Sequence, residues 1–103
     1  MNTNRVYAAF VQLHILHHAS KGPIFGLWIV EELVRHGYRL SPGTLYPILH
    51  KLERAGYLVS GRQLVSGHTR RVYTILPAGR EALEEAKHKV RELFRELLEE
   101  ADD

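Results

Sequence analysis

Histidines carry most of the metal-binding potential in this sequence, and two of them stand at helical spacing. The chain of 103 residues has seven histidines and no cysteine, so disulfides, thiol catalysis and cysteine-ligated zinc are excluded. His14 and His18 lie one turn apart on a predicted helix, where two imidazoles can hold a transition metal. No carboxylate or cysteine lies near them in the sequence. We therefore interpret the pair as polar or titrating positions at a dimer surface, and predict no metal site and no cofactor.

Catalytic side chains do not fall into a known pattern. Ser41, His50 and Glu53 are the residue types of a nucleophilic triad, but Ser41 and His50 fall on or beside one helix, which is unsuitable geometry. Glu31 and Glu32 are adjacent and face different ways, and a phosphate-cradling nucleotide loop is absent. We therefore predict that the protein is not an enzyme.

The stretch SPGTLYPILHKLERAGYL, which begins at Ser41, combines an apolar stripe with a face suited to nucleic acid. Four aliphatic residues recur at helical spacing and predict the inward side: Leu45, Ile48, Leu49 and Leu52. A glycine lets the backbone approach a phosphate, hydroxyls donate to phosphate oxygens, and a helix N-terminus favours an anion. Such side chains lie on or beside the outward face: Gly43, Thr44, Tyr46, Pro47, His50, Lys51 and Arg54.

The sequence allows two starting positions for this helix. Ser41 and Thr44 are both good N-caps. A start at Pro42 leaves Pro47 inside the helix, where it forfeits a backbone hydrogen bond. A start after Thr44 places Pro47 in the first turn, where its missing N–H costs nothing.

After Gly56 the pattern YLVSGRQLVSGHTRRVYTIL predicts two strands joined by the loop SGHT. Arg70 and Arg71 are neighbours on one strand and face opposite sides, so one can reach a phosphate or a minor groove. Arg62 lies on the other strand. The predicted DNA-binding residues are therefore Ser41, Gly43, Thr44, Tyr46, Pro47, His50, Lys51, Arg62, Arg70 and Arg71.

The surrounding pattern predicts a mainly α chain with a small β-hairpin. A first helix is expected over residues 4–20 and a second from Leu27 to Gly37, which suits a left-handed helix end. A brief extended segment is expected at residues 38–40, and Pro77 begins a last helix. Three helices followed by a two-stranded ribbon form a winged helix-turn-helix, whose third helix enters the DNA major groove.

The second helix has a predicted buried stripe in which Ile29 pairs with Leu33 and Val30 with Val34. Trp28, the sole tryptophan, stands beside this stripe and is expected in the core. The alternative places it against a cavity at a dimer interface.

The last helix carries a heptad-like seam on an otherwise charged surface. A body of this size is too small to bury both the seam and the largely apolar first helix. We therefore expect a second copy of the chain to bury them in a dimer interface. The predicted dimerisation residues are Phe10, Leu13, Leu83, Ala86, Val90, Leu93, Phe94 and Leu97. Residues 1–76 then form the DNA-binding domain and residues 77–103 the dimerisation helix, within one compact unit.

Charge is divided unevenly along the chain. Residues 1–80 hold ten Lys and Arg against three Asp and Glu, whereas residues 81–103 hold four against nine, so a net +7 and −5 combine to +2. A basic body suits a polyanion such as DNA. No apolar run is long enough to span a bilayer and no signal peptide is indicated, so we expect a cytoplasmic protein.

The sequence resembles the PadR-like family of transcriptional regulators over nearly its whole length. Pro23 and Gly26 match the Pro-x-x-Gly entry to the second helix, and Gly56 matches the glycine before the wing. The Gly-Thr-Leu-Tyr-Pro block matches from Gly43 to Pro47 and is followed by Leu49, Lys51, Leu52 and Glu53. The end of the wing matches from Gly67 to Tyr73 and the turn into the last helix from Pro77 to Arg80.

This resemblance implies a homodimeric repressor that binds a pseudo-palindromic operator, with a small-molecule effector at the dimer interface as a further partner. Two departures stand out. Leu27 and Trp28 replace a tyrosine common after the helix-two glycine, and Leu76 replaces a capping threonine, which costs roughly 1 kcal/mol. The alternative function is a winged-helix protein-interaction module that does not bind DNA.

Overall fold

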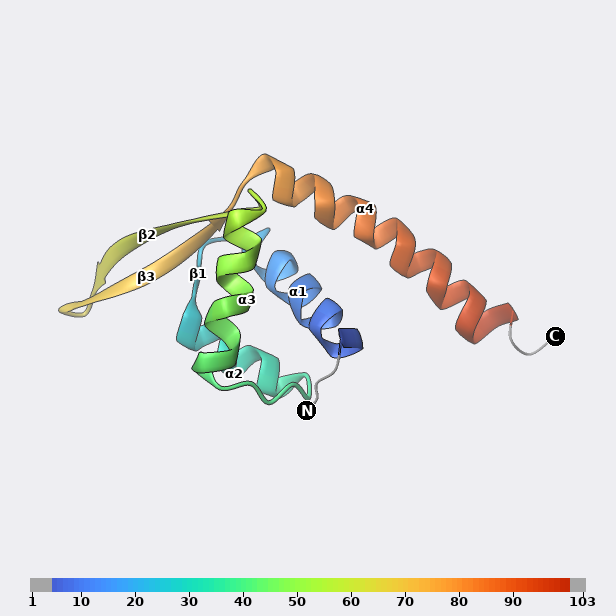
Figure 1. Ribbon diagram of the computed structural model, residues 1–103, viewed down its shortest axis with the longest axis horizontal. Coiled ribbons are helices and arrows are strands. Elements are labelled where there is room, and N and C mark those ends of the chain that lie inside the picture. The colour runs from blue at the N-terminus through green and yellow to red at the C-terminus, as the bar shows by residue number, and fades with distance from the viewer. Residues whose placement is uncertain (1–4, 101–103) are drawn as a thin grey trace.

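The computed structural model describes residues 5–100, which form four α-helices, a π-helical turn and a small sheet. In chain order these are α1 (Arg5–Ala19), β1 (Ile24–Phe25), α2 (Gly26–Arg35), α3 (Pro42–Arg54), β2 (Leu58–Val65), β3 (His68–Ile75), α4 (Pro77–Phe94) and η1 (Arg95–Glu100). Helices α1 to α3 gather into one body, the β2–β3 hairpin projects on one side, and α4 extends on the other (Figure 1). The prediction of a mainly α chain with a small hairpin is confirmed.

The core lies where α1, α2 and α3 meet the base of the hairpin. Its fully covered side chains include Ile15 of α1, Ile29 of α2, Leu45 and Leu49 of α3, and Tyr73 of β3. The predicted inward stripe of α3 is confirmed, with Ile48 partly buried against the same cluster. Burial of this stripe fixes the rotation of α3 about its axis, so the opposite face must point outward.

Two predictions about α2 are wrong. Trp28 is 44% exposed rather than in the core, with its ring roughly perpendicular to that of His18, and Val34 is 42% exposed. The helix is short and its covered side is narrow, since Ile29 and Leu33 alone reach full burial among its large apolar residues. The helix ends as expected, because Gly37 has φ of +90°.

The sheet has the strand order β1-β3-β2 and is antiparallel throughout. Strand β1 was not predicted, because two residues are too few for a periodic pattern. Instead an extended segment was expected at residues 38–40, which form no strand. Strand β1 pairs Ile24 with Tyr73 and Phe25 with Val72, and so anchors the base of the hairpin to the start of α2.

The hairpin turn is shorter than predicted. Pairing continues out to Val65 and His68, which leaves only Ser66 and Gly67 as the loop. Both residues have positive φ, 51° and 80°, and such turns match the twist of the flanking strands. The expected SGHT loop was therefore too long, and the paired wing is correspondingly longer.

The start of α4 is held by hydrogen bonds to the residue after α1 and to the residue before β2. Arg80 donates to the Ser20 carbonyl at 3.3 Å, and the Leu76 N–H donates to the Tyr57 carbonyl at 2.9 Å. Leu76 occupies the N-cap position without a side-chain hydrogen bond, as predicted. The last α-helical residue is Phe94, and the π-helical turn η1 continues the same rod.

Candidate nucleic-acid interface

The N-terminus of α3 is capped at Ser41, which settles the start of the helix at Pro42. The Thr44 N–H donates to Ser41 Oγ at 3.2 Å. Pro42 occupies the first helical position, where its missing N–H is not needed. Pro47 therefore lies inside the helix, and the Gly43 carbonyl one turn earlier lacks its usual backbone donor.

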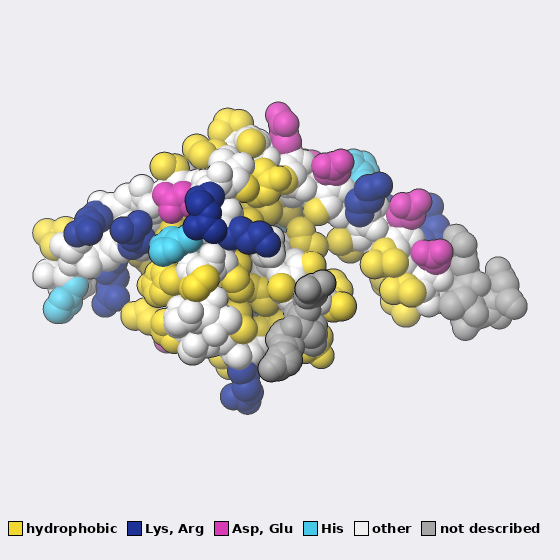
Figure 2. Space-filling view, in the orientation of Figure 1, with side chains coloured by type: hydrophobic (Ala, Val, Ile, Leu, Met, Phe, Trp, Pro, Cys, Tyr) yellow, Lys and Arg dark blue, Asp and Glu magenta, His cyan; other side chains and the backbone are white. Residues whose placement is uncertain are grey.

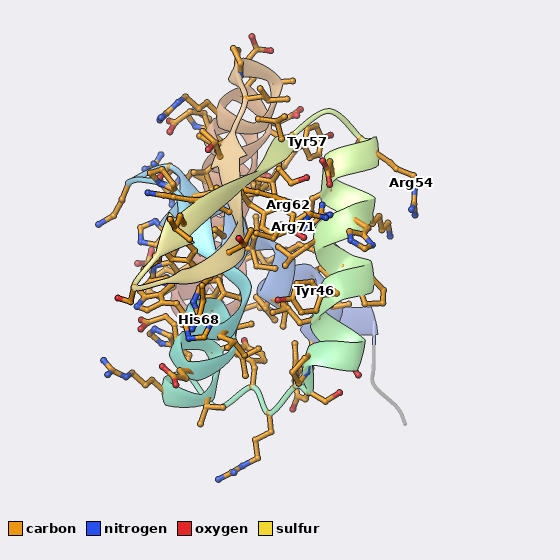
Figure 3. The ribbon with its side chains drawn as sticks, turned by 90° about the vertical axis from the view of Figure 1, so that its left-hand side faces the viewer. Tyr46, Arg54, Tyr57, Arg62, His68 and Arg71 are labelled. Atoms are coloured by element: carbon orange, nitrogen blue, oxygen red, sulfur yellow. The ribbon has the colours of Figure 1, made fainter. Side chains whose placement is uncertain are left out.

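The outward face of α3 is exposed along its whole length. The exposed residues are Ser41, Gly43, Thr44, Pro47, His50, Lys51 and Arg54. They place hydroxyls at the positive end of the helix and two cations towards its C-terminal end, a set that can donate to phosphates and to base edges. Arg54 points away from the body in Figure 3.

Tyr46 differs from its neighbours on α3, because it is only partly exposed and packs against the core. Figure 3 shows it on the side of α3 that faces the rest of the molecule. Its ring lies directly against Gly26 at the start of α2: a Cβ added at Gly26 would be 2.8 Å from Tyr46 Cζ. Tyr46 therefore holds α3 against α2, a positioning role that its wheel position did not indicate.

The hairpin presents its predicted arginines on two faces. Arg62 pairs with Arg71 across the strands, and Gln63 pairs with Arg70. Cross-strand partners share a face, so Arg62 and Arg71 lie on one side of the sheet and Arg70 on the other. The side chain of Arg71 contacts Ser60, which in turn contacts α3, so the Arg62 and Arg71 side is the one turned towards α3 (Figure 3).

A short hydrogen-bond chain joins the hairpin to the end of α3. Arg71 Nη1 donates to Ser60 Oγ at 3.0 Å, and the Ser60 hydroxyl and N–H donate to Glu53 Oε2 at 2.7 and 3.1 Å. The hydrogen bond from the Ser60 hydroxyl is the main cause that lowers the pKa of Glu53. The sequence pattern did not indicate this link, because it joins residues from three elements.

Charge is segregated over the surface as it is along the sequence. Figure 2 shows Lys and Arg side chains over the hairpin and α3, whereas acidic side chains follow α4. The basic side therefore coincides with the exposed donors of α3. Among the described residues, no helix is long and apolar enough to cross a membrane.

The predicted dimerisation residues divide into an exposed set and a covered one. Leu83 is buried in the core of its own chain, and Ala86 and Leu13 are partly buried. The exposed large apolar residues of α1, α4 and η1 are Val6, Tyr7, Phe10, Val90, Leu93, Phe94, Leu97 and Leu98. Several of these line an apolar groove of about 550 Å³ between α1 and α4, together with His14 and His17.

Three helices with a hydrogen-bonded wing, and a third helix that carries exposed donors, define a winged helix-turn-helix protein. Residues 15–85 match the Transcriptional regulator PadR-like family, and the chain belongs to that family. The family is one of transcriptional regulators and not of enzymes, in agreement with the prediction from the sequence.

Relatives of this chain extend over most of its length. It is 57% identical over 90 residues to Transcriptional regulator Rv3488 of Mycobacterium tuberculosis, with 87% of this chain and 84% of that protein covered. A solved PadR family transcription regulator from hypervirulent Clostridium difficile R20291 has TM-score 0.75 at 21% identity, covering 86% of this chain and 98% of that one. A Streptococcus transcriptional regulator has TM-score 0.84 at 19% identity, covering 92% and 95%. Both structural likenesses concern the fold alone.

Proposed function

We propose that this regulator binds DNA sequence-specifically and acts as a homodimeric repressor on an inverted-repeat operator. The observation that carries the proposal is the exposed face of α3, with hydroxyls at the helix N-terminus and His50 and Lys51 further along the helix. The apolar stripe beneath holds that face outward. In this arrangement α3 enters the major groove, and the hairpin reaches the neighbouring backbone. A regulator of this kind works in the cytoplasm, where the chromosome lies.

The side of the hairpin that faces α3 supports one docking orientation. Arg62 and Arg71 lie on that side, and the Ser60–Glu53 link joins the hairpin to α3. In this orientation Arg62 meets a phosphate, Arg71 supports the wing, and Arg70 on the opposite face contributes less.

Salt-dependent binding tests the docking. Fluorescence anisotropy of a labelled operator, found by selection from random duplexes, is measured over a range of salt concentrations. Affinity falls as salt rises. We expect Lys51→Ala and Arg62→Ala each to make this fall shallower, reducing the steepness of log affinity against log salt by about one, as lost phosphate contacts do. Arg70→Ala on the hairpin and Lys89→Ala on α4 are the matched controls, and each should change the salt dependence less. His50→Ala should change base preference more than slope.

The outcome separates DNA binding from the alternative function. No binding to mixed genomic DNA even at low salt would overturn the proposal and favour a protein-interaction module. An unchanged affinity and slope for Lys51→Ala would show that α3 is not the docking element. A reporter gene whose operator overlaps the promoter then tests repression, since a bound dimer would exclude the polymerase.

The half-exposed apolar side chains of α1, α4 and η1 support a dimer as the working form. Leu93 is 46% and Leu97 59% exposed, so covering the remainder contributes roughly 1 kcal/mol per residue. A two-fold axis there would cover both copies at once and set the two α3 helices roughly 34 Å apart, one turn of DNA. The covered α1–α4 groove would then be the place for a small-molecule effector.

Oligomeric state tests this assembly. We expect Leu93→Asp with Leu97→Asp to yield a monomer by light scattering that keeps its helix content by circular dichroism but loses operator binding. Leu64→Asp, at an equally apolar exposed site on the hairpin, should leave the mass unchanged. A wild-type monomer at micromolar concentration, or a double variant that stays dimeric and binds, would contradict the assembly.

A further inference from the structure

Three histidines converge on the side of the molecule where α1 meets the end of α2. His14 and His18 come from α1, and His36 is the residue that follows α2. Each can offer a ring nitrogen, and these three atoms lie within 4.8 Å of one another. The rings of His14 and His36 are stacked with centroids 4.7 Å apart. Three imidazoles from two elements therefore point into one small volume.

A carboxylate, that of Glu32, lies beside two of the three imidazoles. Glu32 Oε2 lies 3.4 Å from His36 Nε2 and 3.7 Å from His18 Nε2. The side chains of Glu32 and His18 are only 17% and 16% exposed. Arg35 approaches the other oxygen, Oε1, at 4.0 Å from the exposed side. Oε2 is therefore the oxygen that faces the imidazoles.

One nitrogen of the cluster is buried without a hydrogen bond, although Glu32 lies 3.7 Å away. His18 Nε2 is inaccessible to water and accepts or donates no hydrogen bond among the described residues. Buried polar atoms are nearly always satisfied, so an orphan of this kind needs an explanation. A ligand at the centre of the cluster would supply the missing contact.

Burial favours the neutral form of two of these imidazoles, because it lowers the pKa of His14 and of His18. Burial is the main cause that lowers the pKa of His14, and His36 and His17 lower it further while Glu32 raises it. Burial likewise lowers the pKa of His18, against the effect of Glu32 and together with His17, His14 and His36. Neutral imidazole is a metal ligand, whereas imidazolium is not.

We propose that His14, His18, His36 and Glu32 form a binding site for a divalent transition metal ion of the zinc type. Three imidazoles and a carboxylate are a ligand set that such ions take in tetrahedral geometry. Ligand atoms around tetrahedral zinc lie roughly 3.4 Å apart, as follows from bonds of about 2.0–2.1 Å. The distances from Glu32 Oε2 to His36 Nε2 and His18 Nε2, 3.4 and 3.7 Å, are close to this spacing, and the three imidazole nitrogens lie within 4.8 Å of one another. The bound ion ties α1 to α2 through their side chains.

The only tryptophan of the chain provides a built-in reporter. The Trp28 ring lies 5.3 Å from the His18 ring, edge to face. Co²⁺ quenches indole fluorescence at such short range, and its visible absorption is strong in tetrahedral and weak in octahedral coordination. A titration of the wild-type chain therefore reports both where the ion binds and its geometry, without any substitution.

The experiment uses the untagged, metal-free chain and titrates it with Zn²⁺ by calorimetry and with Co²⁺ by fluorescence and absorption. We expect one ion per chain, quenching of Trp28 by Co²⁺ and a tetrahedral spectrum. His36→Gln and Glu32→Gln should each weaken binding about tenfold or more, since both remove a ligand. His88→Gln, on the exposed surface of α4, is the matched control and should bind as the wild type does.

Two results would overturn the proposal. One is the absence of Zn²⁺ and Co²⁺ binding to the folded wild-type chain at tenfold excess of metal. The other is binding that persists at full affinity in a His14→Gln and His36→Gln double variant whose circular dichroism matches that of the wild type. Thermal unfolding adds a check on folding: Zn²⁺ should raise the midpoint of the wild type and of His88→Gln, but not that of the double variant.

Discussion

Replacement of Gly26 by alanine tests how α3 is held against α2. Gly26 opens α2 and is buried, and the Tyr46 ring of α3 lies against it. An alanine Cβ would be 2.8 Å from Tyr46 Cζ and 3.0 Å from Cε1, and would also meet the hydroxyl oxygen. Carbon atoms in favourable contact are about 3.5–4.0 Å apart, so the ring or the helix must move by roughly 1 Å.

The effect of Gly26→Ala on the free energy of unfolding can be estimated from two opposing contributions. Overpacking of this kind destabilises by about 1–3 kcal/mol. An alanine also restricts the unfolded chain and helps the helix by about 0.4–1 kcal/mol, which offsets part of that cost. We therefore expect Gly26→Ala to lower the free energy of unfolding by roughly 1–2 kcal/mol.

A double-mutant cycle assigns this loss to the Tyr46 ring. Urea unfolding is measured for Gly26→Ala, Tyr46→Ala and the pair. With the ring gone, Gly26→Ala should be neutral or stabilising, which gives a coupling energy of about 1–3 kcal/mol between the two sites. Gly43→Ala is the matched control, because its Cβ would meet nothing closer than Ser41 Oγ at 3.7 Å.

Operator binding supplies the second readout. A shifted Tyr46 tilts α3, so Gly26→Ala should weaken operator binding although Gly26 is buried away from the exposed α3 face. A Gly26→Ala chain as stable as the wild type, or a coupling energy near zero, would refute the idea that this contact positions α3.

Two further substitutions test the contacts at the base of the hairpin, one with α3 and one with α4. Because Ser60 lowers the pKa of Glu53, the folded form binds fewer protons than the unfolded chain, so this stabilisation is present above the unfolded pKa and is lost as pH falls through the folded pKa. Glu53→Gln should flatten that part of the stability curve in urea unfolding from neutral to acid pH, and an unchanged curve would contradict it. Gly79→Ala would bring a Cβ against the Tyr57 carbonyl and Ile75, and since backbone yields less than a side chain we expect a loss of about 2 kcal/mol or more. Gly61→Ala, with open space at that position, is its control in thermal unfolding.

The sequence predicted the elements whose pattern repeats along the chain. The stripe from Leu45 to Leu52 is periodic over two turns, so it indicated both the helix and its buried side, and the structure confirms both. The cap at Ser41 was among the candidates because its chemistry is local. Strand β1 was missed, since it exists only through its pairing with Tyr73 and Val72.

Side chains with two plausible environments were harder to place. Trp28 is apolar enough for a core, but its burial depends on which neighbours cover that side of α2. Tyr46 looked like an outward residue because wheel position alone ignores that Gly26 leaves room for its ring. The Glu53–Ser60 hydrogen bond forms only because the end of α3 and the base of β2 lie within hydrogen-bonding distance of each other. A helical wheel or strand alternation describes one element at a time, so none of these contacts can be read from it.

The histidine cluster shows which signal could have carried the prediction further. His14 and His18 are four residues apart on one helix, and Glu32 and His36 are four apart at the end of the next. Each pair shares one side of its helix, because residues four apart are neighbours on a helical surface. Consecutive helices of a helix-turn-helix protein pack against each other, so two such pairs of ligand-type residues can meet across the contact. One pair alone is common and means little. Two pairs on adjoining helices are a more specific pattern, and only the packing of α1 on α2 decides whether the two pairs meet, and here the three imidazoles converge with Glu32 beside His18 and His36.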